Sequence, residues 1–225
     1  MTADFHDLRI KMVDNQIRTT DVTNLAVLDA FLAVPREEFV PAARRDLAYI
    51  DEDTLVKPAS PAGGAARYLM EPSPFAKLVQ LAAIEPGDVV LDIGTGSGYS
   101  AAVLSRLASS IIAVESDSDL AAEATAKLSE LGYDNVVIVT APLTEGYPSE
   151  APYDVIILEG AVDFVPDALF DQLKNGGRLV AVEGHGNAGV AKLYVKDEDI
   201  VSGRRAFNLA VKPLPGFARA PQFEF

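Results

Sequence analysis

The chain has 225 residues, 49% hydrophobic and 23% charged, so a single domain of this size can bury a core of its own. The net charge of −14 disfavours a nucleic-acid partner, because affinity for phosphates comes mainly from Lys and Arg. The lack of cysteine excludes disulfides and thiolate sites. Residues 1–10 lack the apolar stretch of a secretory signal, and no apolar run approaches the ~18 residues that span a bilayer. We therefore expect a cytoplasmic protein without a membrane partner.

Periodic apolar residues predict helices in the first third of the chain. Apolar positions three and four apart between residues 8 and 17 predict a first helix. A second helix is predicted from Thr23, as its N-cap, to the break at Pro35. The run of Pro, Ala, Ser and Gly at residues 56–64 indicates a loop or a short linker.

From residue 75 onward, predicted helices and strands alternate. The helices are expected at residues 75–82, 100–107, 119–131 and 166–173. The strands are expected at residues 89–93, 111–115, 136–140, 155–159 and 178–183. Continuous apolar strands between amphipathic helices are typical of an α/β fold with a doubly wound, mostly parallel sheet. Residues 193–196 and 204–211 follow in quick succession, which predicts an antiparallel pair at the C-terminal end.

We expect one domain over residues 1–225. Residues 1–75 would form an N-terminal helical cover and a substrate-side loop, and residues 76–225 the cofactor-binding α/β core.

A glycine-rich turn follows the predicted strand 89–93 and reads Asp92-Ile93-Gly94-Thr95-Gly96-Ser97-Gly98-Tyr99. Gly94 and Gly96 can take backbone angles closed to other residues and let a ligand approach the main chain, while the next helix offers free N–H groups. The dinucleotide fingerprint needs its third glycine where this chain has Tyr99. The pattern Asp92-x-Gly94-x-Gly96-x-Gly98 instead resembles the first motif of S-adenosylmethionine-dependent methyltransferases.

Two carboxylates accompany this turn. Glu115 closes the next strand, where a carboxylate can accept hydrogen bonds from both ribose hydroxyls of either cofactor class. Asp92 stands in an apolar strand, where a carboxylate is costly to bury without a partner, and a ligand ammonium is a reasonable partner. The expected cofactor is S-adenosylmethionine. A dinucleotide enzyme, or a tight turn without a ligand, is the alternative.

Further motifs lie along nearly the whole chain. They include Met12-Val13-Asp14-Asn15-Gln16-Ile17-Arg18, Val34-Pro35-Arg36-Glu37-Glu38-Phe39-Val40-Pro41 and Gln172-Leu173-Lys174-Asn175-Gly176-Gly177-Arg178-Leu179. Together with the glycine turn they resemble the protein-L-isoaspartate O-methyltransferases. The resemblance implies a Rossmann-like class I methyltransferase fold and methyl transfer to the carboxylate of an isoaspartyl residue in a damaged protein or peptide. A carboxylate is already anionic at pH 7, so no catalytic acid or base is assigned.

The resemblance also implies a set of cofactor-binding residues in and around the turn. They are Leu69, Asp92, Gly94, Thr95, Gly96, Ser97, Gly98, Tyr99, Glu115, Ser116, Ala141, Pro142, Leu143 and Glu159.

The chain departs from the family where the substrate is expected. The family's Thr-Ile-Ser-x-Pro is replaced by Tyr68-Leu69-Met70-Glu71-Pro72. A thioether cannot donate the hydrogen bond of the serine, and Glu71 would repel an incoming carboxylate. The candidates on the substrate side are Arg67, Tyr68, Met70, Glu71 and Ser73.

Two further departures concern the cofactor. Ala141-Pro142-Leu143 replaces the family's Gly-Asp-Gly and removes a carboxylate expected near the adenine. Glu159 ends a strand where small residues are common, and either a site role or a solvated strand end would explain it.

These departures leave three functions open. They are isoaspartate repair, methyl transfer to another acceptor, and a binding or structural role without the chemistry. No metal site is expected, because the two histidines, His6 and His185, are far apart in sequence.

Overall fold

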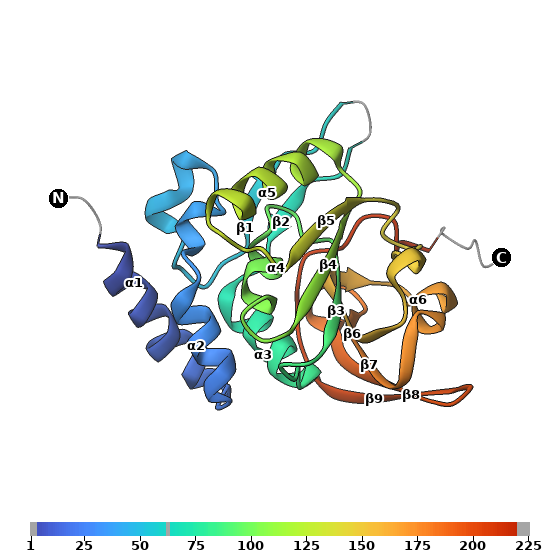
Figure 1. The fold of residues 1–225 in the computed structure, drawn as a ribbon. Helices are drawn as coiled ribbons and strands as arrows, with labels where there is room; N and C mark the ends of the chain where they lie inside the picture. Colours follow the sequence, from blue (N-terminus) through green and yellow to red (C-terminus); the bar gives the residue numbers. More distant parts are fainter. Residues whose placement is uncertain (1–3, 62–63, 220–225) are drawn as a thin grey trace.

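The computed structural model, which describes residues 4–61 and 64–219, contains a seven-stranded sheet in the order β5-β4-β3-β6-β7-β8-β9 (Figure 1). Its strands are β3 (Val89–Ile93), β4 (Ser110–Glu115), β5 (Val136–Thr140), β6 (Tyr153–Val162), β7 (Leu173–Glu183), β8 (Val190–Asp197) and β9 (Ile200–Asn208). The pairs from β5 to β7 are parallel, whereas β7-β8 and β8-β9 are antiparallel. The predicted fold class, including the antiparallel C-terminal pair, is confirmed.

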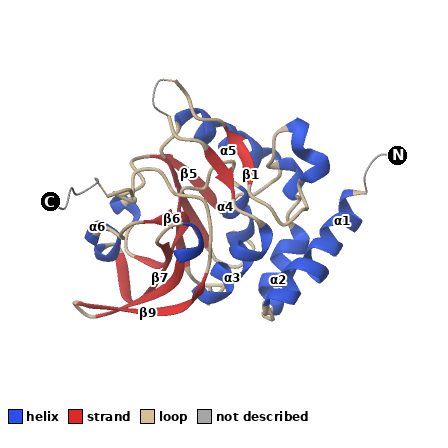
Figure 2. Cartoon of the chain, turned by 180° about the vertical axis from the view of Figure 1, so that it is seen from behind, coloured by secondary structure: helices blue, strands red, loops and turns tan. Residues whose placement is uncertain are grey.

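The strands are apolar on both sides, and helices cover both faces of this sheet. The helices are α1 (Phe5–Met12), α2 (Leu25–Ala33), α3 (Pro72–Ala82), α4 (Tyr99–Leu104), α5 (Ser118–Glu130) and α6 (Asp167–Asp171). One face is covered by α3, α4 and α5 and the other by α6, while α1 and α2 pack on the outside of the α3–α5 layer. In β3, Val90 joins the core formed with α3, α4 and α5, whereas Leu91 and Ile93 join the opposite core with Leu169 of α6. Figure 2 shows α1 and α2 on the side of the molecule away from β9.

The N-terminal helices form as predicted, with two local differences. α1 continues into a π-helical segment at Val13–Ile17. The predicted N-cap of α2 is wrong: Asn24 caps the helix, because its Oδ1 accepts from the N–H groups of Ala26 (2.9 Å) and Val27 (3.3 Å). The N–H of Thr23 donates to Gln80 instead.

Part of the predicted loop at residues 56–64 is a strand. β1 (Thr54–Lys57) pairs antiparallel with β2 (Arg67–Leu69), and residues 62 and 63 lie outside the described part of the chain. The end of β1 was not predicted for two reasons. The Pro, Ala, Ser and Gly that follow it are typical of a loop, and a strand of four residues is too short to show a clear alternation of apolar and polar residues. This hairpin matters for the site, since β2 carries Arg67 and Tyr68.

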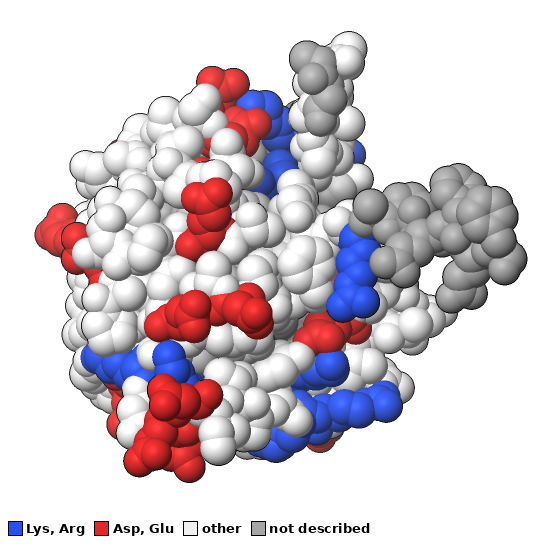
Figure 3. Space-filling view, turned by 90° about the vertical axis from the view of Figure 1, so that its right-hand side faces the viewer, with Lys and Arg blue, Asp and Glu red and all other residues white. Residues whose placement is uncertain are grey.

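Figure 3 shows the charges on the face that lies to the right in Figure 1. Lys and Arg form small separate groups there, between groups of Asp and Glu, and not one continuous basic surface. Within residues 4–61 and 64–219, no helix has both the length and the apolarity to cross a bilayer.

Candidate functional site

The glycine turn joins β3 to α4 with its three glycines in left-handed conformations. The φ angles are 89° at Gly94, 58° at Gly96 and 91° at Gly98. Residues with a Cβ rarely adopt these angles, so the chain can turn this sharply only because glycine occupies the three positions. The turn is fixed to β4, because the N–H of Gly94 donates to the carbonyl of Val114 at 2.8 Å.

Glu115, at the end of β4, is fully buried and hydrogen-bonded by the chain itself. Its Oε2 accepts from the N–H of Gly96 (2.9 Å), and its Oε1 accepts from the N–H of Asp117 (3.0 Å). Oε1 also accepts from Nη1 of Arg67 at 2.5 Å. Ser116 adds a long contact of 3.4 Å from its hydroxyl. The carboxylate expected to bind ribose is therefore held by an arginine.

Arg67 reaches this position from β2 and is 5% exposed. Its Nη2 also donates to the carbonyl of Gly94 at 3.2 Å. The side chain thus bridges the ends of β3 and β4, directed toward the turn.

The C-terminal segment places Leu214 against the same turn. The carbonyl of Ala161 accepts from the N–H of Leu214 (2.8 Å), and the N–H of Ala161 donates to the carbonyl of Lys212 (2.9 Å). A Cβ added to Gly94 would lie 2.5 Å from Leu214 Cδ1. The space beside Gly94 is therefore filled by this leucine.

Two neighbouring carboxyl groups lie on β3 and β6: Asp92 is fully buried near the end of β3, and Glu159 is partly buried inside β6. The prediction that Glu159 ends its strand is wrong, because β6 continues to Val162. Asp92 accepts at Oδ2 from the hydroxyl of Ser100 at 2.7 Å, and that hydroxyl lies 3.1 Å from the hydroxyl of Thr95. Burial raises the pKa of Asp92 to about 7, although these two hydroxyls oppose the shift. Burial, and then the charge of Asp92, also raise the pKa of Glu159 well above its ordinary value.

A small cavity of about 10 Å³ brings several of the predicted residues together between β2, α3 and the turn. Its lining consists of Tyr68, Leu69, Met70, Phe75, Gly94, Thr95, Tyr99, Ser100 and Glu159. Phe75 and Ser100 were not among the predicted site residues, because their types carry no signal of their own. Leu143 instead packs into the core formed with Leu91 and Ile93, and Pro142 accepts the N–H of Glu145.

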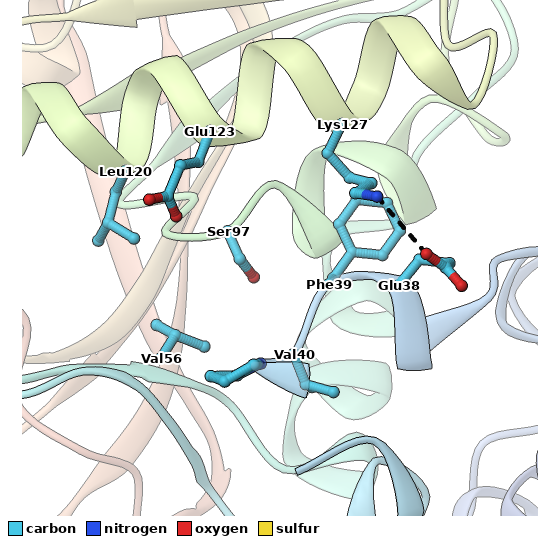
Figure 4. A pocket seen from close by; sticks show the side chains of 9 residues that line it. Glu38, Phe39, Val40, Val56, Ser97, Leu120, Glu123 and Lys127 are labelled. Carbon is cyan, nitrogen blue, oxygen red and sulfur yellow. Dashed lines mark hydrogen bonds and ion pairs between the residues drawn. The ribbon is translucent and has the colours of Figure 1, made fainter. Parts of the chain in front are cut away.

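Ser97 belongs to a different cavity, of about 240 Å³, shown in Figure 4. It lies between α5, residues 38–41 and β1, and the Ser97 side chain points into it. The Oγ of Ser97 is buried without a hydrogen-bond partner. Lys127, on the α5 side, forms an ion pair of 3.5 Å with Glu38. This cavity could not be predicted from the sequence, because its lining comes from four separate segments.

The remaining substrate-side residues are held by neighbours. The hydroxyl of Ser73 donates to Oδ2 of Asp51 (2.5 Å), and its N–H donates to Oδ1 of the same residue (2.9 Å). The hydroxyl therefore has a hydrogen-bond acceptor within the chain and is not free to donate to a substrate. Met70 is 6% exposed, and its carbonyl accepts from Arg36 at 2.8 Å. The ammonium group of Lys212 lies over the ring of Tyr68, 5.5 Å from the ring centroid.

The acidic group around Glu71 makes stability depend on pH. Burial, followed by the charges of Asp53 and Asp51, raises the pKa of Glu71 to about 7, while Lys212 opposes the shift. Because the pKa is higher in the folded than in the unfolded chain, the protonated form is favoured by folding. This contribution is complete below the unfolded pKa and is lost as the pH rises through about 7.

We expect the free energy of unfolding to fall between about pH 5 and pH 8, and to fall less in the variant Glu71→Gln. Urea denaturation across this range measures both slopes. Glu150→Gln, which removes an exposed carboxylate away from the group, is the control. Equal slopes in wild type and Glu71→Gln would contradict the assignment.

The polar groups fit the expected cofactor in chemistry. Glu115 suits ribose hydroxyls, and the carboxylates of Asp92 and Glu159 suit a cationic group. Two side chains, however, occupy positions that the cofactor would need: Arg67 is hydrogen-bonded to Glu115, and Leu214 fills the space beside Gly94. S-Adenosylmethionine therefore fits the residues present, provided that these two side chains move.

Comparison with known proteins identifies the family of this chain. The family model described as protein-L-isoaspartate(D-aspartate) O-methyltransferase matches residues 8–214. A protein-L-isoaspartate O-methyltransferase of Koribacter versatilis is 40% identical over 172 residues, covering 76% of this chain and 74% of the relative. One of Roseiflexus castenholzii is 37% identical over 213 residues, covering 95% and 94%.

Solved structures show the same fold. A protein-L-isoaspartate O-methyltransferase matches with a TM-score of 0.78 at 27% identity, over 94% of this chain and 66% of that longer one. A putative protein-L-isoaspartate O-methyltransferase from Plasmodium falciparum, in complex with S-adenosyl-L-homocysteine, matches with a TM-score of 0.75. It is 17% identical and covers 92% of this chain and 97% of its own, so that likeness concerns the fold alone. The predicted family is confirmed: this chain belongs to the protein-L-isoaspartate(D-aspartate) O-methyltransferase family.

Proposed function

We propose that this protein transfers the methyl group of S-adenosylmethionine to the carboxylate of an isoaspartyl residue in a damaged protein or peptide. The observation that carries the proposal is the glycine turn with Asp92 and Glu115 at the ends of adjacent strands, in a chain of the matched family. In the transfer, an oxygen–carbon bond forms as the sulfur–carbon bond breaks, and the electron pair stays on sulfur. The products are a methyl ester and S-adenosylhomocysteine.

The chain contributes position and environment. Gly94 and Gly96 allow the ligand to approach the main chain, and Glu115 binds the ribose hydroxyls once Arg67 has left it. Tyr68 and Met70 line the cavity on the substrate side. The acceptor carboxylate is its own nucleophile, so alignment and exclusion of water carry the catalysis.

Methyl transfer from labelled cofactor to an isoaspartyl peptide tests the proposal. The matched control is the same peptide with ordinary aspartate, which we expect to remain unlabelled. Labelling of the isoaspartyl peptide alone supports repair. If no label transfers at high enzyme concentration, the repair function is wrong.

One observation favours a second function, methyl transfer to a different acceptor. Met70 stands where the family has serine, and the hydroxyl of the nearby Ser73 is held by Asp51. Glu71, next to Met70 in sequence, has its pKa raised to about 7 by burial, so it adds negative charge to this side of the site mainly above neutral pH. This alternative predicts labelling of components of a cell extract but not of the peptide. If S-adenosylhomocysteine does not bind at all, a binding or structural role is the remaining choice.

Replacing Met70 with serine is expected to raise kcat/KM for the isoaspartyl peptide severalfold. The serine hydroxyl supplies the hydrogen bond to the substrate carboxylate that a thioether cannot donate. Met70→Ala is the matched control, because it shortens the side chain equally without adding a donor. Transfer kinetics on both variants measure the effect, and equal rates would show that a missing hydroxyl does not limit the reaction.

A further inference from the structure

Asp92 and Glu159 occupy adjacent strands at the same edge of the sheet. Ile93 of β3 pairs with Leu158 of β6, so Glu159 stands one position beyond that pair, level with Gly94. Asp92 is fully buried and Glu159 is partly buried. Asp92 Oδ1 and Glu159 Oε1 are both buried oxygens without a hydrogen-bond partner.

No positively charged side chain compensates these two oxygens among the described residues. Arg67 of β2 is committed to Glu115 and the carbonyl of Gly94. Glu115 of β4 adds a further negative charge near Asp92. The hydroxyl of Tyr99, on α4, is buried without a partner and is not a cation. Among the ion pairs of the described residues, none involves Asp92 or Glu159.

The adjoining cavity has the size of one small group. Its volume of about 10 Å³ is close to the lower limit that holds a water molecule, and an ammonium group has a similar size. Glu159 lines it together with Thr95 and Ser100, whose hydroxyls can accept hydrogen bonds as well. Two neighbouring carboxylates, each with a buried oxygen that lacks a partner, are costly unless a proton or a cation compensates them.

We infer that Asp92 and Glu159 form a seat for an ammonium-sized cationic group, and that Glu159 makes this protein select ligands that carry one. The inference rests on the proposed function, because the ligand in question is the cofactor with its amino-acid ammonium. The resembled family commonly has a small residue in place of Glu159. The second carboxylate is therefore a property of this chain.

Calorimetry with three adenosyl thioethers isolates the ammonium group. S-Adenosylhomocysteine carries both ammonium and carboxylate, S-adenosyl-3-thiopropylamine carries the ammonium alone, and 5′-methylthioadenosine carries neither. We expect Glu159→Gln to weaken binding of the first two by about tenfold and to leave the third unchanged. Glu150→Gln is the charge-matched control at an exposed position and should change none of the three.

Protonation gives a second readout. A cation in the seat favours the ionised carboxylates, so binding releases protons. Because the pKa of Asp92 is raised to about 7, we expect the affinity for S-adenosylhomocysteine to rise between about pH 6 and pH 8. Calorimetry in buffers of different ionisation enthalpy counts these protons at each pH. In Glu159→Gln we expect fewer protons released and a flatter pH dependence.

The outcomes separate the inference from the function on which it rests. If Glu159→Gln changes all three affinities alike, or none, the seat does not exist, although the cofactor site stands. If neither wild type nor Glu150→Gln binds any of the three, the cofactor assignment itself is wrong. Glu159→Ala, checked for folding by circular dichroism, repeats the test and should weaken the two amines again.

Discussion

Replacing Arg67 with alanine is expected to tighten the binding of S-adenosylhomocysteine by on the order of a hundredfold. In the wild type, Arg67 donates to Glu115 at 2.5 Å and both side chains are nearly inaccessible to solvent. The ribose hydroxyls must therefore displace a buried, charge-assisted hydrogen bond before they reach the carboxylate. Alanine removes this competitor and leaves Glu115 free. Calorimetric titration of both proteins measures the change.

The same variant should be less stable without ligand. Removing one partner of a buried ion pair leaves an uncompensated charge and generally costs about 3 to 5 kcal/mol. Glu115 keeps the N–H groups of Gly96 and Asp117, which places the expected loss toward the lower end of that range. Ligand should raise the melting temperature of Arg67→Ala more than that of the wild type.

Arg178→Ala is the matched control for this experiment. Arg178 forms another partly buried pair, with Asp88 at 2.6 Å, between β7 and the loop before β3. Its loss should lower stability and leave the affinity for the ligand unchanged. Weaker or equal binding by Arg67→Ala would show that the arginine supports the site and does not compete for it.

The sheet could be predicted because its strands carry their own signal. The observed bounds of β3 and β5 are those predicted, since each is a mostly apolar run between turn residues, with Asp92 the one charged residue in β3. The angles of Gly94 and Gly96 were also foreseeable, because a strand-to-helix turn with these glycines has few other conformations.

The pairings across the site could not be predicted. Arg67 and Glu115 are 48 positions apart in sequence, and neither periodicity nor spacing links them. The same holds for Ser73 and Asp51, which are 22 positions apart on two different segments. Their contacts depend on how the β1-β2 hairpin packs on the sheet, and that hairpin was itself concealed by its composition. The glycine turn therefore indicates where a ligand is expected to bind, but not which side chains of the chain lie against that turn.

A second buried arginine, Arg36, holds the segment that contains Met70. Replacing Arg36 with alanine is expected to lower the free energy of unfolding by about 4 kcal/mol. Arg36 is 0% exposed. It donates from Nε to the carbonyl of Ala48 (2.7 Å) and from Nη2 to that of Met70 (2.8 Å). Its guanidinium also lies 4.9 Å from the ring centroid of Tyr99. Alanine would leave two buried carbonyls unpaired and a cavity beside the ring.

Urea denaturation of Arg36→Ala measures this loss, with Arg44→Ala as the control at an exposed position nearby. Arg36→Lys should recover only part of the stability, because an ammonium cannot reproduce the planar fork that reaches both carbonyls. A loss below about 1 kcal/mol in Arg36→Ala would mean that water replaces the guanidinium at little cost. Since the Met70 carbonyl is one of the two acceptors, the full loss would show that the stability of the fold depends on how Met70, which lines the small cavity beside the glycine turn, is held.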